Sequence, residues 1–101
     1  MVGRRDAERD IRGRPIDLTG ANLSRVQAKG VRFIGANLTQ ATLASANLME
    51  AMLQKSKLYG ADLRGANLFG ANLGQILVDT ETRVLGANLK RALLFPKAKT
   101  P

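Results

Sequence analysis

The side chains that usually carry enzyme chemistry are almost absent from this chain. Its 101 residues include no His, Cys or Trp, so there is neither an imidazole to act as a general base nor a thiol to act as a nucleophile. Eight carboxylates remain. Acid–base work by carboxylates requires two of them in one concave site, and here they are scattered. The sequence therefore predicts no enzyme activity and no catalytic residue.

The acidic residues have structural interpretations instead. Asp17 and Asp62 each stand directly before a leucine of a recurring pattern, where a carboxylate can accept hydrogen bonds from its own turn. Asp79 and Glu81 lie in a polar stretch, which favours a solvated loop over a metal site. We expect no metal and no other cofactor.

Large apolar residues recur at every fifth position. They are Leu18, Leu23, Phe33, Leu38, Leu43, Leu48, Leu53, Leu58, Leu63, Leu68, Leu73 and Val78, and the smaller Ala28 is the exception. A period of five fits neither the 3.6 residues of a helical turn nor the 2 of a strand. The chain must therefore turn once in every repeat to bring these side chains together, which is typical of a solenoid.

Two other positions of the repeat are equally regular. The residue two places before each centre is usually Ala, and Asn or Asp often stands directly before the centre. Alternating small and large inward residues suit a narrow, closely packed tube. Gly60, Gly65 and Gly70 follow their centres by two places without the lysine of a phosphate-binding loop, so we interpret them as turn residues.

The repeated tetrads closely resemble the pentapeptide-repeat family, whose consensus is A(N/D)LXX. They are Gly20-Ala21-Asn22-Leu23, Gly35-Ala36-Asn37-Leu38, Gly60-Ala61-Asp62-Leu63, Gly65-Ala66-Asn67-Leu68, Gly70-Ala71-Asn72-Leu73 and Gly86-Ala87-Asn88-Leu89. The resemblance covers roughly residues 16 to 94. It implies an all-β fold, a right-handed quadrilateral parallel β-helix with four pentads in each of about four coils. Residues twenty apart would then stack.

The ends depart from the pattern. We expect a tail or weak cap over 1–15, the β-helix over 16–95 with an insertion near 79–84, and a basic tail over 96–101. Val78 to Val84 takes six residues, which should bulge the wall at one corner. Whether Ile76, Leu77, Val84 and Leu85 cap the core or expose an apolar end stays open. Because the ends of this family often mediate dimers, the resemblance also implies a homodimer through one end as an alternative.

The formal net charge of +8 favours anionic partners. Some pentapeptide-repeat proteins imitate the negative charge of DNA and bind topoisomerases, and this chain has the opposite sign, which argues against such mimicry. Nucleic acid or an acidic membrane is an alternative partner, set against a merely solvated basic face. The candidate anion-binding residues are Arg25, Lys29, Arg32, Lys55, Lys57, Arg64, Lys90 and Arg91.

An apolar patch is the other surface signal. Met49, Phe69 and Met52 occupy positions that should point outward, and such patches often mark a partner site. With no chemistry available, we expect a non-enzymatic protein–protein interaction or scaffold module.

A further alternative rests on resemblance. The segments 70–83 and 86–92 look like the ends of pentapeptide modules on accessory proteins of bacterial secretion apparatus. The resemblance implies a bacterial protein. The first residues lack the apolar run of a leader and no run approaches membrane-spanning length, so a cytoplasmic location is expected.

Overall fold

The computed structural model describes Arg9 and residues 13–94. Phe95, the basic tail over 96–101 and most of the expected N-terminal tail lie outside the described residues. Within the expected tail, Arg9 forms an antiparallel bridge with Pro15, and its guanidinium donates to the carbonyl of Gly13 at 3.0 Å.

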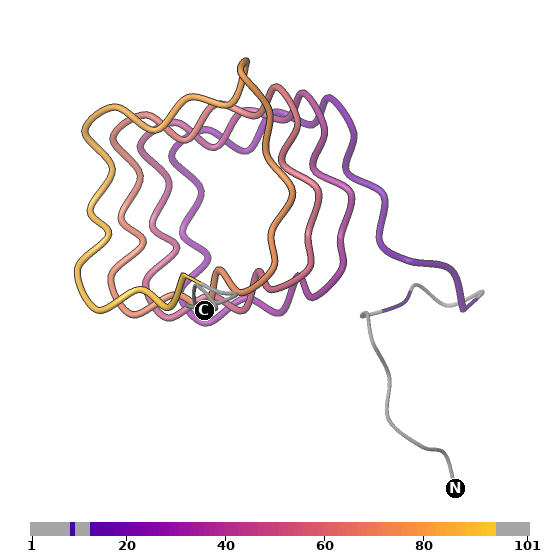
Figure 1. The fold of residues 1–101 in the computed structure, drawn as a ribbon, viewed down its shortest axis with the longest axis horizontal. Helices are drawn as coiled ribbons and strands as arrows, with labels where there is room; N and C mark the ends of the chain where they lie inside the picture. The colour runs from indigo at the N-terminus through magenta and orange to yellow at the C-terminus, as the bar shows by residue number, and fades with distance from the viewer. Residues whose placement is uncertain (1–8, 10–12, 95–101) are drawn as a thin grey trace, which may run out of the picture.

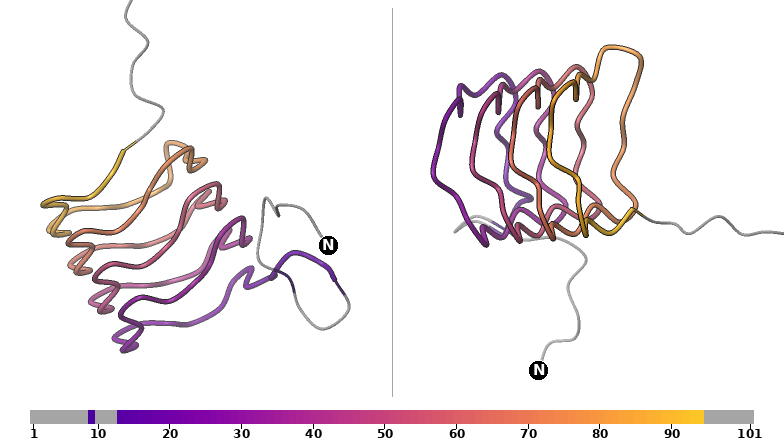
Figure 2. Two further views of the ribbon diagram at one scale, coloured as in Figure 1. Left: turned by 90° about the horizontal axis from the view of Figure 1, so that it is seen from below. Right: turned by 90° about the vertical axis from the view of Figure 1, so that its left-hand side faces the viewer.

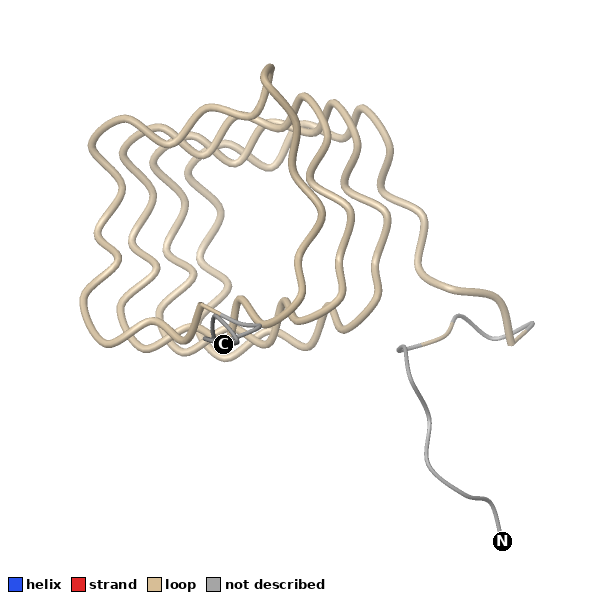
Figure 3. Ribbon diagram, viewed as in Figure 1, coloured by secondary structure: helices blue, strands red, loops and turns tan. Residues whose placement is uncertain are grey.

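The described chain winds into stacked, four-sided coils (Figure 1). This is the right-handed quadrilateral parallel β-helix that the family resemblance implied. Seen from the side, the coils lie one above another from the N-terminal to the C-terminal end (Figure 2). The described residues contain no helix and no continuous strand, because each face contributes a single bridging residue before the chain turns again (Figure 3).

Parallel bridges between residues twenty apart, or twenty-one apart after the insertion, define four faces. Face 1 carries Asp17, Asn37, Lys57 and Leu77; face 2 carries Asn22, Thr42, Asp62 and Arg83; face 3 carries Gln27, Asn47, Asn67 and Asn88; and face 4 carries Arg32, Met52, Asn72 and Leu93. On each face the amide beside the bridge donates to the next coil, as Leu43 N donates to Asp62 O at 2.7 Å. The backbone is thus paired along the stack as in a parallel sheet.

The corners are tight turns, and most of them are closed by a hydrogen bond. At the first, the amide of Ala21 donates to the carbonyl of Leu18 at 3.0 Å, and Gly20 has a φ of 70°. Positive φ at the second central residue is the geometry of a type II turn. Arg25 and Ser45 hold the same corner position with φ of 62° and 59°, so the fold imposes this conformation even where the residue is not Gly.

The Asn or Asp before each centre secures the turn that follows. The side-chain oxygen of Asn37 accepts the amide of Thr39 at 3.1 Å, and Asn67 accepts that of Phe69 in the same way at 3.1 Å. Asp17 and Asp62 hold the amides of Thr19 and Arg64 at 3.1 and 3.0 Å. These bonds satisfy corner amides that the ladder between coils leaves unpaired.

The interior is a column of leucines and alanines. The buried residues are Ala36, Leu38, Ala41, Leu43, Ala46, Leu48, Ala51, Leu53, Ser56, Leu58, Ala61, Leu63, Ala66, Leu68, Ala71 and Leu73. Both inward positions of the repeat therefore point into the tube. Ser56 takes an alanine position, and its fully buried hydroxyl has no hydrogen-bond partner.

The bridge register changes from 20 to 21 residues between Lys57↔Leu77 and Asp62↔Arg83. The corner near residue 80 projects beyond the corners stacked with it (Figures 1 and 2). Here a carboxylate of Asp79, 3.0 Å from Gly60 N, accepts the amide that elsewhere donates to the next coil. The hydroxyl of Thr82 donates to Leu58 O at 2.7 Å. The bulge is thus tied to the coil by side chains.

Candidate interaction surfaces

The expected apolar patch lies around the corner between faces 3 and 4. Met49 and Phe69 are stacked at that corner, and Met52 is a bridging residue of face 4. All three are half-buried. A guanidinium nitrogen of Arg32 lies 3.3 Å from the sulfur of Met52. The structure therefore brings the three residues into one area, but each side chain is only partly exposed.

The candidate anion-binding residues are spread around the coil. Lys57 lies on face 1 and Arg32 on face 4, while the others occupy corners after face 2, face 3 or face 4. Lys29 and Lys90 share the corner column that carries Met49 and Phe69, one at each end. The structure does not gather these residues into one basic surface.

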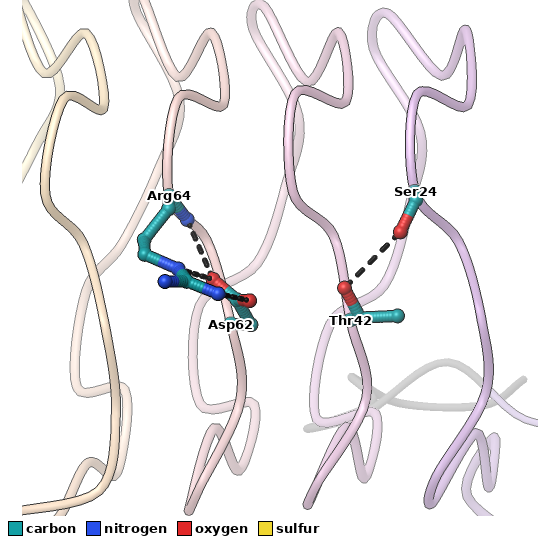
Figure 4. A network of polar contacts seen from close by, with 4 residues as sticks. All are labelled: Ser24, Thr42, Asp62 and Arg64. Atoms are coloured by element: carbon teal, nitrogen blue, oxygen red, sulfur yellow. Dashed lines mark hydrogen bonds and ion pairs between the residues drawn. The ribbon is translucent and has the colours of Figure 1, made fainter.

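Arg64 is committed to an ion pair. Its guanidinium donates two hydrogen bonds to Asp62, at 2.9 and 2.7 Å, on face 2 (Figure 4). Hydrogen bonds from the side chain and amide of Arg64 lower the pKa of Asp62 to about 2. In the neighbouring coils of the same face, the hydroxyls of Ser24 and Thr42 lie 3.1 Å apart. The guanidinium of Arg64 is thus paired with Asp62 within its own coil, and its side chain is still 49% exposed.

Face 3 is a stack of amides. Asn47 donates to the side chain of Gln27 at 3.3 Å, and Asn88 donates to that of Asn67 at 3.4 Å. The same Asn67 oxygen also holds its own turn. These amides serve the wall, and the face carries no charge at its bridging positions.

The acidic side chains of the described residues lie apart from one another. No group of three or more Asp and Glu side chains lies close enough to hold a metal ion there. The pKa of Asp79 is lowered, chiefly by the amide of Gly60, and that of Asp17 is lowered by Thr19. The carboxylate of Asp17 therefore serves a turn, and that of Asp79 serves the bulge. An open groove of about 470 Å³ runs beside Asp17 and Lys57 near the N-terminal end.

The largest concentration of exposed apolar side chains lies in the last coil. The exposed large apolar residues of the described chain are Leu77, Val78, Val84, Leu85, Leu89, Leu93 and Leu94. Four of them, Val78, Val84, Leu89 and Leu94, are the inward centres of this coil and are 38–59% exposed. The centres directly beneath, Leu58 to Leu73, are at most 4% exposed. None of the described residues covers the C-terminal end of the tube, and we call residues 76–94 the apolar end.

The apolar end also holds a small cavity of about 90 Å³. Leu58, Leu68, Val84 and Leu89 are among its lining residues, and Thr82 is the one hydroxyl residue there. The sequence left open whether this segment caps the core; Leu77, Val84 and Leu85 are exposed, and Ile76 is half-buried. The signal in the sequence was the run of apolar residues around the six-residue step, after which only two pentads, centred on Leu89 and Leu94, follow before Pro96.

Comparisons with known proteins agree with this geometry. The family model of pentapeptide repeats matches residues 16–54 and 46–75 with eight copies. The chain belongs to the pentapeptide-repeat family. That match ends just before the apolar end. As a pentapeptide-repeat protein, the chain derives its regular wall from the A(N/D)LXX pattern, and the six-residue step lies outside the matched pentads.

Solved structures of other pentapeptide-repeat proteins are similar. HetL, involved in heterocyst differentiation regulation in the cyanobacterium Nostoc, is 21% identical, with a TM-score of 0.39, 79% of this chain and 60% of that chain covered. A protein of the Arabidopsis thaliana thylakoid lumen is 31% identical, with a TM-score of 0.34; the match covers 76% of this chain and 60% of that chain. A second Nostoc protein is 31% identical, with a TM-score of 0.36; the match covers 75% of this chain and 62% of that chain. The chain thus spans about three fifths of the length of these structures. No curated protein matches it.

The described residues contain no helix with the length and apolar character needed to cross a bilayer.

Proposed function

We propose that this pentapeptide-repeat chain is a non-enzymatic protein–protein interaction module whose contact surface is the apolar end. The observation that carries the proposal is the exposure of the inward centres of the last coil. Monomeric proteins rarely leave contiguous apolar surface of this kind uncovered, and such surfaces commonly mark sites of association. The half-buried patch of Met49, Met52 and Phe69 is a weaker candidate, because its side chains already contact the wall.

Affinity capture from the source organism tests this role with two matched double variants. Leu85→Ser with Leu93→Ser changes outward residues of the apolar end that are 81% and 46% exposed, so the core should survive. Met49→Ser with Phe69→Ser changes the side patch. We expect the first variant to lose a partner that wild type and the second variant retain. The partner, once purified, should bind wild type directly. Retention of every partner by the end variant refutes the proposal.

Binding of nucleic acid or an acidic membrane is the second candidate, supported by the net charge of +8. If this is its role, the protein should bind duplex DNA or anionic vesicles at low ionic strength, and its affinity should fall steeply as salt is added. Equal affinity at low and high salt, or no binding at low salt, counts against it. The dispersal of the cations over several faces makes this surface less focused than the apolar end.

A further inference from the structure

The apolar end exposes backbone as well as side chains. In the coil beneath, the amides of Leu63 and Leu68 donate to the carbonyls of Arg83 and Asn88, and the carbonyls of Ala61 and Ala66 accept from the amides of those two residues. The equivalent groups of the last coil are the amides of Val84 and Leu89 and the carbonyls of Thr82 and Ala87. No described residue pairs with them. They form an open edge on faces 2 and 3.

Edges of this kind accept an added strand. Val84 and Leu89, which carry the free amides, are also inward centres. They are 47% and 38% exposed and line the cavity of about 90 Å³. A segment added here would follow the path of the coil beneath. It would pair with the free backbone groups and place one small and one large apolar side chain inward on each face.

The charged side chains of residues 83–94 are all positive. Arg83 is the bridging residue of face 2, Lys90 and Arg91 form the corner after face 3, and all three are exposed. Between residues 83 and 94 there is no acidic residue. Asp79 and Glu81 precede this edge in the bulge, where Asp79 binds the amide of Gly60. The edge over faces 2 and 3 is therefore complementary to negative charge.

We infer that the edge formed by residues 82–92 docks an extended acidic protein segment, which adds to faces 2 and 3 as a further half-coil. This deepens the proposed interaction role and rests on it. The segment supplies apolar side chains over Val84 and Leu89 and carboxylates beside Arg83, Lys90 and Arg91. Nucleic acid lacks the alternating backbone amides and carbonyls that the edge would pair with.

A second copy of this chain fits the edge less well than an acidic segment does. A symmetric end-to-end contact would bring Arg83, Lys90 and Arg91 against their own counterparts. A head-to-tail contact would bring them against the first coil, where Arg25 and Lys29 are exposed. Like charges facing one another across an interface oppose association. An acidic segment meets the same backbone and apolar requirements without this repulsion.

The probe is a blocked ten-residue peptide, two repeats of Ala-Asp-Leu-Glu-Gly, titrated against the whole chain and followed by NMR chemical shifts. Two control peptides replace the acids by Lys or the Leu by Ser. We expect the acidic peptide to bind at least tenfold more tightly than either control. Amides of Val84 and Leu89 should become protected from hydrogen exchange in the complex, as we expect those of Leu63 and Leu68, which are hydrogen-bonded, to be in the free chain.

Charge variants locate the contact. Arg83→Ala with Arg91→Ala should weaken binding of the acidic peptide about fivefold to tenfold. Arg25→Ala with Lys29→Ala removes the same charge from the first coil and should leave binding unchanged. Binding that resists both variants, or that leaves the amides of Val84 and Leu89 unprotected, overturns the inference.

Three further results would also overturn it. They are equal binding of the Lys peptide, absence of binding by the acidic peptide, and protection of the same edge amides by self-association at high protein concentration. If the peptide fails while Leu85→Ser with Leu93→Ser still loses a captured partner, only the acidic-segment inference fails. If that variant also keeps every partner, the interaction role fails with it.

Discussion

Replacing Ser56 by Ala should stabilise the coil. The side chain is 0% exposed and its hydroxyl has no hydrogen-bond partner, whereas most of the other small inward positions of the inner coils hold Ala. In the unfolded chain the hydroxyl binds water, so folding forfeits that hydrogen bond without replacing it. An unsatisfied buried polar group costs about 1–3 kcal/mol. Ser56→Ala should recover roughly 1 kcal/mol of this, since a small void replaces the oxygen.

The reverse substitution is the matched control. Ala51 is the preceding small inward position, also 0% exposed. Ala51→Ser places a hydroxyl in the same environment and should destabilise the coil by about 1–3 kcal/mol. Urea unfolding followed by circular dichroism measures both free energies. A change of 1 kcal/mol corresponds to a shift in Tm of roughly 4–8 °C for a domain of this size.

The two variants should therefore move in opposite directions. If Ser56→Ala destabilises the protein, the hydroxyl has a hydrogen-bond partner and the reasoning about this position is wrong. If Ala51→Ser is neutral, the inward position tolerates polar groups and the tube is less tightly packed than the structure indicates. Either result would refute the claim that the small inward positions are closely packed and disfavour an unpaired polar group.

Three other predictions concern the core, the corners and the acid response. Leu48→Ala removes a fully buried side chain and should lower the free energy of unfolding by roughly 3–5 kcal/mol. Leu85→Ala, at an 81% exposed position, should change it by less than about 0.5 kcal/mol. Similar losses for both variants would contradict the burial of Leu48. Gly20→Ala meets no atom within 4 Å, so its cost of about 1 kcal/mol in urea unfolding should come from the φ of 70° alone; a neutral result would contradict that corner geometry. The pKa of Asp62 is lowered from 3.8 to about 2, so the stability it contributes is present above pH 3.8 and is lost as pH falls toward about 2. In Asp62→Asn the urea midpoint should depend less steeply on pH within that window, and its dependence on pH above the window should be unchanged. If the midpoint of the variant falls with pH as that of wild type does, the ion pair with Arg64 does not stabilise the fold.

The core could be predicted from the sequence because the repeat fixes it. A leucine such as Leu48 is buried by neighbours five and twenty residues away, and the same pattern specifies those neighbours. The role of Asp62 in its turn could also be predicted from the sequence, because the hydrogen bond that it accepts from the amide of Arg64 is local. Local chemistry and strict periodicity together determined the wall and the axis.

The ends could not be predicted in the same way. The exposure of Val84 and Leu89 depends on whether another coil covers them, and no local pattern states this. The contact between Asp79 and Gly60 spans 19 residues across the insertion, so it requires the three-dimensional register. The clustering of Met49, Met52 and Phe69 followed from the repeat, but their partial burial depends on how side chains lie along the wall.

The central claim is that residues twenty apart stack on one face, and engineered cysteine pairs test it most directly because the chain has no cysteine of its own. Asn47 and Asn67 are bridged in neighbouring coils of face 3, so their Cα atoms should lie about 4.8 Å apart, within the range that a disulfide spans. Asn47→Cys with Asn67→Cys should therefore cross-link under mild oxidation. Asn47→Cys with Asp62→Cys, on different faces, should not. Efficient cross-linking of the second pair and none of the first would contradict the coil.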